Sequence, residues 1–147
     1  MTYPRNIVVG GDHAGFPYKD AIINHLTHKG YVVLDVGTNS TVSVDYPDFA
    51  HAAADAVESG RADLGVLLCG SANGVSITAN KHQSVRCALC WREDVAALAR
   101  QHNDANIVAI PARFVSLESA LDIIDAFLLA QFEGGRHATR VGKIACR

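Results

Sequence analysis

The sequence predicts an α/β fold in which a parallel β-sheet carries helices on both faces. Short apolar runs alternate along the whole chain with segments whose apolar residues recur every three to four positions. Regular alternation of strand and helix is typical of βαβ units, which make a parallel sheet with helices covering it. The chain has 147 residues, enough for one hydrophobic core, so residues 1–147 are expected to form a single domain.

Five apolar runs are the predicted strands. The third of them, Leu-Gly-Val-Leu-Leu-Cys, is apolar throughout. Runs of four to eight such residues are typical of strands that are buried on both faces. The five strands are expected at residues 6–10, 31–36, 64–69, 85–90 and 106–110.

Two of the intervening segments show the helical period most clearly. Pro47 stands near the start of the first and Gly60 at its end, where these residue types favour helix termini. Ser116 is the predicted N-cap of the second. The apolar face of the first consists of Phe49, Ala52, Ala53, Ala56 and Val57, and that of the second of Leu117, Ala120, Leu121, Ile124 and Leu128.

Composition and charge exclude several classes of function. No apolar run approaches the roughly 18 residues that a membrane span needs, and no signal-peptide pattern is visible, so no membrane partner is expected. The 13 basic and 15 acidic residues give a net charge of −2, which gives no reason to expect a nucleic-acid partner. We expect a globular, cytoplasmic protein.

The four cysteines are expected to be reduced. Cys87 and Cys90 form one C-x-x-C pair, but a zinc site would need a second pair or suitably spaced histidines, and neither is evident. Two cysteines in a buried strand is the favoured interpretation. His25 and His28 are interpreted as part of an amphipathic helix.

Ionisable residues gather at one predicted edge of the sheet. In open α/β sheets, ligands bind beyond the carboxyl ends of the strands. The segments that follow the first, third and fifth strands therefore form the predicted crevice. Its candidate residues are Asp12, His13, Cys69, Ser71 and Arg113.

Known loop motifs do not account for this edge. The segment Gly-Ser-Ala-Asn-Gly after Cys69 lacks the Lys of a Walker loop, and Gly-Gly-Asp-His-Ala-Gly is not a dinucleotide fingerprint. A cysteine phosphatase would need an arginine six residues after the thiol, where this chain has Val75. No Ser-His-Asp or Cys-His-Asn set is recognisable from spacing.

Cys69 is left as a thiol at the start of a predicted helix. The positive end of a helix favours a thiolate and lowers a cysteine pKa. The amide groups of residues 70–74 are also placed to bind an anion, such as a phosphate or a developing oxyanion. A thiolate beside such donors suits attack on a carbonyl or removal of a proton next to one. An inert buried cysteine explains the spacing equally well.

His102 ends the predicted buried face of a helix, which also contains Val95, Leu98 and Ala99. The carboxyl end of a helix favours an imidazolium. This helix is expected to run antiparallel to the strands, which places His102 at the opposite edge from Cys69. The two side chains would then meet most simply across two subunits. The alternative is a histidine hydrogen-bonded within its own turn.

Arg136 and Arg140 stand four residues apart near the end of the chain. A helix would place both on one face, where two guanidinium groups can grip a phosphate through forked hydrogen bonds. A solvated basic face is the other explanation.

Six segments of the chain together resemble a known family. They read GGDHAGF, DVGT, DYPDFA, CGSANGVSITANK, RQHNDANIV and EGGRHATRV, and they lie between about residues 6 and 144. In this order and spacing they are similar to ribose-5-phosphate isomerase B and its relatives that act on allose and galactose 6-phosphates.

The resemblance implies a Rossmann-like, three-layer α/β/α sandwich with a five-stranded parallel sheet. It implies a homodimer or a dimer of dimers, with the site shared between subunits and the tail, about residues 133–147, contacting a neighbour. No metal or other cofactor is implied. The implied reaction interconverts ribose 5-phosphate and ribulose 5-phosphate through an enediol.

The resemblance also implies the roles of individual residues. Cys69 would move the proton between C2 and C1, His102 would open the furanose ring, and Asp12 would handle hydroxyl protons. The Ser71 hydroxyl and the loop of Gly70, Ala72, Asn73 and Gly74 would stabilise the enediolate. Tyr46 would line the pocket, Asn103 would contact the sugar, and the phosphate would be held by His13, Arg113, Arg136 and Arg140, with His137 as a further candidate.

Ala72 departs from the family pattern, which has glycine there. If the backbone needs a positive φ at this position, alanine costs roughly 1 kcal/mol; otherwise its methyl group would narrow the pocket. The alternatives that remain are a hexose 6-phosphate isomerase, a non-catalytic sugar-phosphate binder and a metal-dependent hydrolase.

Overall fold

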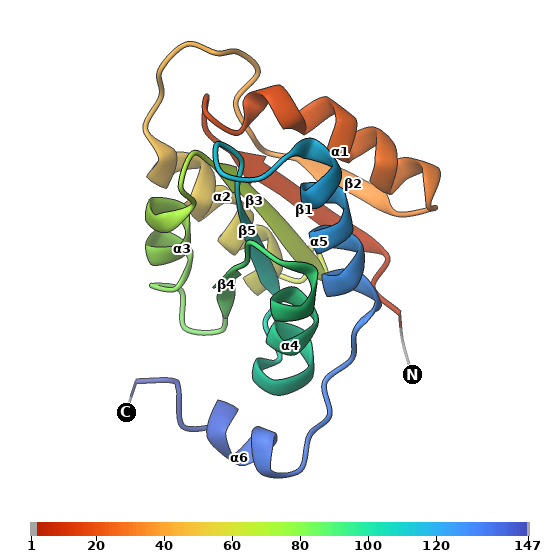
Figure 1. The fold of residues 1–147 in the computed structure, drawn as a ribbon. Helices are drawn as coiled ribbons and strands as arrows, with labels where there is room; N and C mark the ends of the chain where they lie inside the picture. Colours follow the sequence, from red (N-terminus) through yellow and green to blue (C-terminus); the bar gives the residue numbers. More distant parts are fainter. Residues whose placement is uncertain (1–2, 147) are drawn as a thin grey trace.

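The computed structural model describes residues 3–146 and contains a five-stranded sheet with the strand order β2-β1-β3-β5-β4 (Figure 1). All four strand pairs are parallel. The strands are β1 (Asn6–Gly11), β2 (Val32–Asp35), β3 (Leu64–Cys69), β4 (Cys87–Leu89) and β5 (Ile107–Pro111). The helices are α1 (Phe16–His28), α2 (Tyr46–Glu58), α3 (Asn73–Ala79), α4 (Glu93–Asn103), α5 (Leu117–Leu129) and α6 (Arg136–Val141).

Two apolar clusters show that the sheet is the middle of three layers. The side chains of α1, α4 and α5 pack on one face of the sheet, where β3 contributes Val66 and Leu68. The side chains of α2 and α3 pack on the other face, where β3 contributes Leu67 and Cys69. Because successive strand residues point to opposite faces, both faces of β3 are apolar and all six of its residues are buried. The predicted α/β/α architecture is confirmed.

The strand predictions are confirmed with small shifts at the ends. The largest concerns β4, which spans only Cys87–Leu89 of the predicted 85–90. Val85 and Cys90 are buried on either side of it but lie outside the strand. As an edge strand, β4 pairs only with β5, so its ladder is short.

The predicted helix termini are confirmed more closely than the predicted faces. Ser116 caps α5, since its Oγ accepts a hydrogen bond of 3.1 Å from the Ser119 amide. The buried residues of α2 are Ala50, Ala53, Ala54 and Ala56, which confirms Ala53 and Ala56 of the predicted face, whereas the predicted Phe49, Ala52 and Val57 are only half-buried. The predicted face was therefore rotated slightly, because two layers of small alanines allow α2 to approach the sheet and α3 closely.

The predicted face of α4 was wrong at Leu98. That side chain is 43% exposed, while Ala96 and Ala99 are buried against α5 and the sheet. His102 is therefore half-exposed at the end of the helix and does not close a buried face.

Candidate active site

Two glycines bring the segment after β1 against the end of β3. A Cβ on Gly11 would lie 2.4 Å from the Leu68 carbonyl oxygen, and one on Gly15 would lie 2.4 Å from the Leu68 Cβ. Only glycine permits this approach. The Asp12 amide then donates a 3.2 Å hydrogen bond to the Leu68 carbonyl. Asp12 is thereby held directly beside the next residue of β3, Cys69.

Cys69 and Asp12 form a buried pair. The Cys69 thiol donates to Asp12 Oδ2 at 3.2 Å, and the two residues are 8% and 5% exposed. The other carboxylate oxygen, Oδ1, accepts hydrogen bonds from the amides of Ala14 at 3.0 Å and Gly15 at 3.3 Å. The carboxylate is fixed by backbone donors and keeps one oxygen for the thiol.

The environment of Cys69 corrects the expectation of a lowered pKa. Burial, the hydrogen bond to Asp12 and the negative charge of Asp12 together raise the pKa of the thiol to about 11. The amides of Gly70 and Ala72 act in the opposite direction, as the helix-start argument requires, but they are outweighed. In one isolated chain, Cys69 is a thiol at neutral pH.

Ala72 adopts the conformation that favours glycine. Its φ is 65°, in the left-handed region, so the first of the two expectations for this position holds. The residue is fully buried in the cluster between the sheet and α2 and α3. Its methyl group therefore packs in the core and does not narrow a pocket.

Ser71 and Asn73 of the 70–74 loop face outward, whereas Gly70 is buried. Ser71 is exposed, and its Oγ accepts a 3.3 Å hydrogen bond from the Asn73 amide, which leaves its hydroxyl hydrogen for a ligand. At Gly74, a Cβ would lie 2.5 Å from the ring of Tyr46. The Tyr46 ring, 40% exposed, therefore rests on the backbone of α3 at Gly74.

His13 and Arg113 line a common cavity of about 400 Å³. His13 Nδ1 accepts a 3.2 Å hydrogen bond from the Val44 amide, so its Nε2 is available to a ligand. The Arg113 side chain lies close to Gly70, where a Cβ would come within 3.3 Å of its Cδ. Ala14 also lines the cavity and donates to Asp12, so the Cys69–Asp12 pair lies immediately behind the wall.

The remaining predicted residues form a second group at the opposite edge of the sheet. His102 and Asn103 end α4, a few residues before β5 begins. Strand β5 runs from that edge of the sheet to the edge where its last residue, Pro111, pairs with Cys69. Helix α6, which carries Arg136, His137 and Arg140, contacts α4. Figure 1 shows α6 beside α4, at the end of the molecule away from the loops that follow β1 and β5. One chain therefore does not bring His102 to Cys69, as the sequence predicted.

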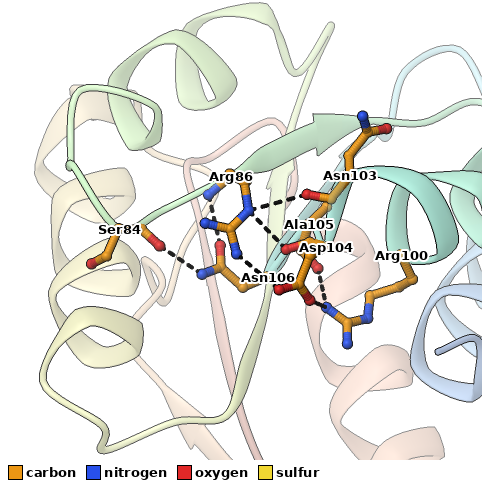
Figure 2. Close-up of polar contacts among 7 residues, drawn as sticks. All are labelled: Ser84, Arg86, Arg100, Asn103, Asp104, Ala105 and Asn106. Atoms are coloured by element: carbon orange, nitrogen blue, oxygen red, sulfur yellow. Dashed lines mark hydrogen bonds and ion pairs between the residues drawn. The ribbon is translucent and has the colours of Figure 1, made fainter. Parts of the chain in front are cut away.

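A hydrogen-bond network fixes the end of α4 (Figure 2). Arg86 Nε donates to the carbonyl oxygens of Asn103 at 3.1 Å and Asp104 at 3.0 Å. Asp104, with φ 46°, turns the chain, and its carboxylate pairs with Arg100 at 3.0 Å and Arg86 at 3.3 Å. The turn that follows His102 is thus held by Arg86, which directly precedes β4, and by Arg100 of its own helix.

Glu133 is a member of the second group that the sequence analysis missed. The imidazoles of His102 and His137 stack with their centroids 4.2 Å apart and their planes 8° from parallel. Glu133 Oε1 lies 3.6 Å from His102 Nε2 and 3.7 Å from His137 Nε2. The sequence feature that could have identified Glu133 is its four-residue spacing from His137.

The C-x-x-C pair is structural. Cys90 is fully buried in the cluster that faces α1, α4 and α5, whereas Cys87 packs against the opposite cluster. The two thiols point to different faces of the sheet and cannot share a metal. All four cysteines are free, as expected.

Comparison with known proteins decides the family. The family model described as Ribose/Galactose Isomerase matches residues 7–144. The chain belongs to the ribose/galactose isomerase family. It is an isomerase, and the resemblance seen in the six sequence segments is confirmed.

Members of the ribose/galactose isomerase family are similar to this chain over nearly their whole length. Ribose-5-phosphate isomerase B of Escherichia coli is 46% identical, with 95% of this chain and 94% of that protein aligned. The structure of ribose-5-phosphate isomerase B from Clostridium thermocellum matches with a TM-score of 0.93 at 50% identity, covering 95% and 94% of the two chains. That of the Mycoplasma genitalium enzyme, which has ribulose-5-phosphate bound, matches with a TM-score of 0.91 at 44% identity, covering 97% and 95%.

Within residues 3–146, no helix has both the length and the apolar character needed to cross a membrane.

Proposed function

We propose that this isomerase interconverts ribose 5-phosphate and ribulose 5-phosphate, with Cys69 as the base. The observation that carries the residue assignment is the Cys69–Asp12 pair, joined at 3.2 Å directly behind the cavity of His13 and Arg113. Relatives over nearly the whole chain are ribose-5-phosphate isomerases B, one of them with ribulose-5-phosphate bound.

Cys69 and Asp12 divide the proton transfers. The thiolate of Cys69 takes the proton from C2 and returns it to C1. Asp12, whose Oδ2 receives the thiol hydrogen bond in the resting chain, moves the hydroxyl proton between the oxygens on the same two carbons. Protons only move within the substrate, so the reaction needs no external oxidant or reductant.

The loop after Cys69 stabilises the charge that develops on the substrate oxygens. Removal of the C2 proton places negative charge on oxygen, and fixed donors that face this charge lower the barrier. The proposed donors are the Ser71 hydroxyl and the amides of residues 70–74, including Gly70 and Gly74. The Asn73 amide donates to Ser71 Oγ in the resting chain and orients that hydroxyl. Tyr46, on Gly74, closes one side of the pocket.

Arginines and histidines hold the phosphate at the far end of the substrate. His13 and Arg113 come from the same subunit as Cys69, at one cavity. Arg136, His137 and Arg140 come from the second group, as does Asn103, which contacts the sugar. These groups position the substrate and leave the proton transfers to Cys69 and Asp12.

The active site is completed by a second copy of the chain. His102, the acid that opens the sugar ring, lies at the opposite edge of the sheet from Cys69 of its own chain. A homodimer, or a dimer of dimers, would place the second group of one subunit against the first group of the other, with the tail of residues 133–147 contacting the neighbour. The added positive charge would then lower the pKa of Cys69 from the high value of the isolated chain.

The test is ribulose 5-phosphate formation from ribose 5-phosphate by the Cys69→Ala variant. We expect activity to fall by at least about a thousandfold, because the base is removed without a replacement. Cys146→Ala, which removes an exposed thiol, is the matched control and should keep full activity. Full activity of Cys69→Ala would exclude the proposed base. Calorimetric binding of ribose 5-phosphate without turnover by the unmodified chain would instead support a sugar-phosphate binder.

The substrate preference is tested by comparing kcat/KM for ribose 5-phosphate and allose 6-phosphate. We expect the pentose to be preferred, and a higher value for the hexose would support the alternative. Activity is expected to survive exhaustive chelation, since the proposed chemistry uses no metal; loss of activity would favour a metal-dependent enzyme. The cytoplasmic location stays a prediction.

A further inference from the structure

Helix α4 ends in a turn with an uncommon backbone conformation. Asp104, which directly follows α4, has φ 46° and ψ 41°, in the left-handed region. Among residues 3–146, the only other non-glycine residue with a positive φ is Ala72, in the loop after Cys69. This conformation is costly for a residue with a Cβ, so it persists only where other contacts hold it. The end of α4 is therefore fixed by its surroundings.

The Arg86 guanidinium makes three of the contacts that hold this turn (Figure 2). Its Nε donates to the carbonyl oxygens of Asn103 at 3.1 Å and Asp104 at 3.0 Å. Its Nη2 donates to the Asp104 carboxylate at 3.3 Å. Carbonyl groups at the end of a helix have no partner within the helix, and a basic side chain can satisfy them. One side chain thus binds both the backbone and the carboxylate of the turn.

Arg86 is itself held in place. Its amide donates to Asn106 Oδ1 at 2.7 Å, and its carbonyl accepts from the Asn106 amide at 2.9 Å. On the other side of the turn, Arg100 donates to the Asp104 carboxylate at 3.0 Å. The end of α4 is therefore tied to the residues that directly precede β4 and β5, so the sheet sets its position.

The two side chains of the second group that α4 carries have few contacts of their own. His102 stacks on His137, and its Nε2 lies 3.6 Å from Glu133 Oε1, which is too far for a hydrogen bond. Asn103 is exposed. The placement of both side chains therefore depends on the backbone that Arg86 binds.

We propose that Arg86 is a positioning residue for the opening of the sugar ring. It holds His102 and Asn103 where they meet the substrate, without touching the substrate itself. The inference rests on the proposed function, in which His102 is the ring-opening acid. In that step the bond between C1 and the ring oxygen breaks, the C1 hydroxyl proton passes to water, and His102 gives a proton to the ring oxygen. A displacement of about 1 Å can slow such a step by roughly a hundredfold.

The kinetic experiment compares ribose 5-phosphate carrying hydrogen or deuterium at C2. In Arg86→Gln we expect kcat/KM to fall at least about tenfold and the C2 isotope effect to disappear. Ring opening does not break the bond between C2 and its hydrogen, so it shows no such effect once it limits the rate. A general disturbance of the site would also displace Cys69, and the isotope effect would persist.

Asp104→Asn is the second variant. Asparagine tolerates the left-handed conformation, but it lacks the carboxylate that pairs with Arg86 and Arg100. The same loss of activity and of isotope effect is expected, and this variant decides the test if Arg86→Gln does not fold. Arg61→Gln, the same substitution at an exposed arginine, is the control and should change neither quantity. Full activity, or reduced activity with a persistent isotope effect, would overturn the proposal.

The placement of His102 is measured separately, without substrate, by NMR of its imidazole. Its signals are assigned by their absence from His102→Ala, and they should shift and broaden in Arg86→Gln but not in Arg61→Gln. Unchanged signals in Arg86→Gln would overturn the positioning role. Changed signals, together with a persistent isotope effect in the residual activity of His102→Ala, would show instead that the ring-opening role proposed for His102 is wrong.

Discussion

At the scale of single residues, the contacts of Cys69 determine how readily its thiol ionises. Asp12 both accepts the thiol hydrogen bond and raises the pKa of Cys69 through its charge, and burial acts in the same direction. A base with a high pKa is strong once ionised but is rarely ionised at neutral pH. The proposed role of Cys69 as the base therefore requires groups that change the electrostatics around the sulfur.

The contribution of Asp12 is measurable in the Asp12→Asn variant. The amide removes the negative charge and should lower the pKa of Cys69 from about 11. We expect about tenfold faster alkylation of Cys69 by iodoacetamide at neutral pH, followed by mass spectrometry of the peptide. The exposed Asp20→Asn is the control. An unchanged rate in Asp12→Asn would contradict the role given to this carboxylate.

Burial of thiols also makes stability depend on alkaline pH. The pKa of Cys69 is raised from 9.0 to about 11 in the folded chain, and Cys87 and Cys90 are raised in the same direction. A thiol whose pKa is higher in the folded than in the unfolded chain stabilises the fold at every pH below the unfolded-state pKa. This stabilisation is lost as the pH rises through the folded-state pKa. Urea midpoints should therefore fall between pH 9 and 11, and a Cys69→Ser variant should show a smaller fall. Equal falls in both proteins would refute this account.

Gly74 and Tyr46 form a second testable pair. A methyl group at position 74 would collide with the Tyr46 ring at 2.5 Å, although alanine favours a helix over glycine by about 1 kcal/mol. Gly74→Ala should therefore add little stability in the unmodified chain but about 1 kcal/mol in a Tyr46→Ala background, measured by urea unfolding. Equal effects in both backgrounds would show that the ring and the backbone do not interact.

At the scale of elements, Glu58 joins the end of α2 to the loop before β4. Its carboxylate accepts hydrogen bonds from the Ser84 hydroxyl at 2.6 Å and the Ser84 amide at 3.1 Å, and it lies 2.8 Å from His82 Nδ1. The bonds to Ser84 and His82 lower the pKa of Glu58 from 4.5 to about 2.

The stabilisation that Glu58 provides through Ser84 and His82 should be lost in acid. A carboxylate whose pKa is lower in the folded than in the unfolded chain contributes its full stabilisation at pH values above the unfolded-state pKa, here 4.5. That contribution is lost as the pH falls toward the folded-state pKa of about 2. The difference in unfolding free energy between the unmodified chain and Glu58→Gln should therefore shrink across that range. Glu93→Gln, at an exposed helix start, is the control. A difference that stays constant from pH 5 to about 2 would contradict the assignment.

At the scale of the whole molecule, the two edges of the sheet carry the two groups of residues that the proposed function joins into one site. The first group contains Cys69 and Asp12, and the second contains His102 and the arginines of α6. A parallel sheet separates them because its strands all run from the second edge to the first.

Mixing inactive subunits tests the shared site directly. Cys69→Ala and His102→Ala chains should each be inactive, while a mixed dimer would contain one intact site. Random pairing should restore about a quarter of the unmodified activity after subunit exchange. Exchange demonstrated with labelled subunits, without any recovery of activity, would show that each site is built within one chain.

The sequence by itself determined the elements and the edge of the sheet that carries Asp12, His13 and Cys69. Hydrophobic periodicity and helix-end signals such as Ser116 are local. The positions of Asp12, His13 and Cys69 at one edge of the sheet follow from the parallel topology. Tertiary structure alone decided which face of α2 and α4 is buried, the pairing of Glu133 with His102 and His137, and the raised pKa of Cys69. These depend on how closely separate segments approach and how much water they exclude, which no local pattern encodes.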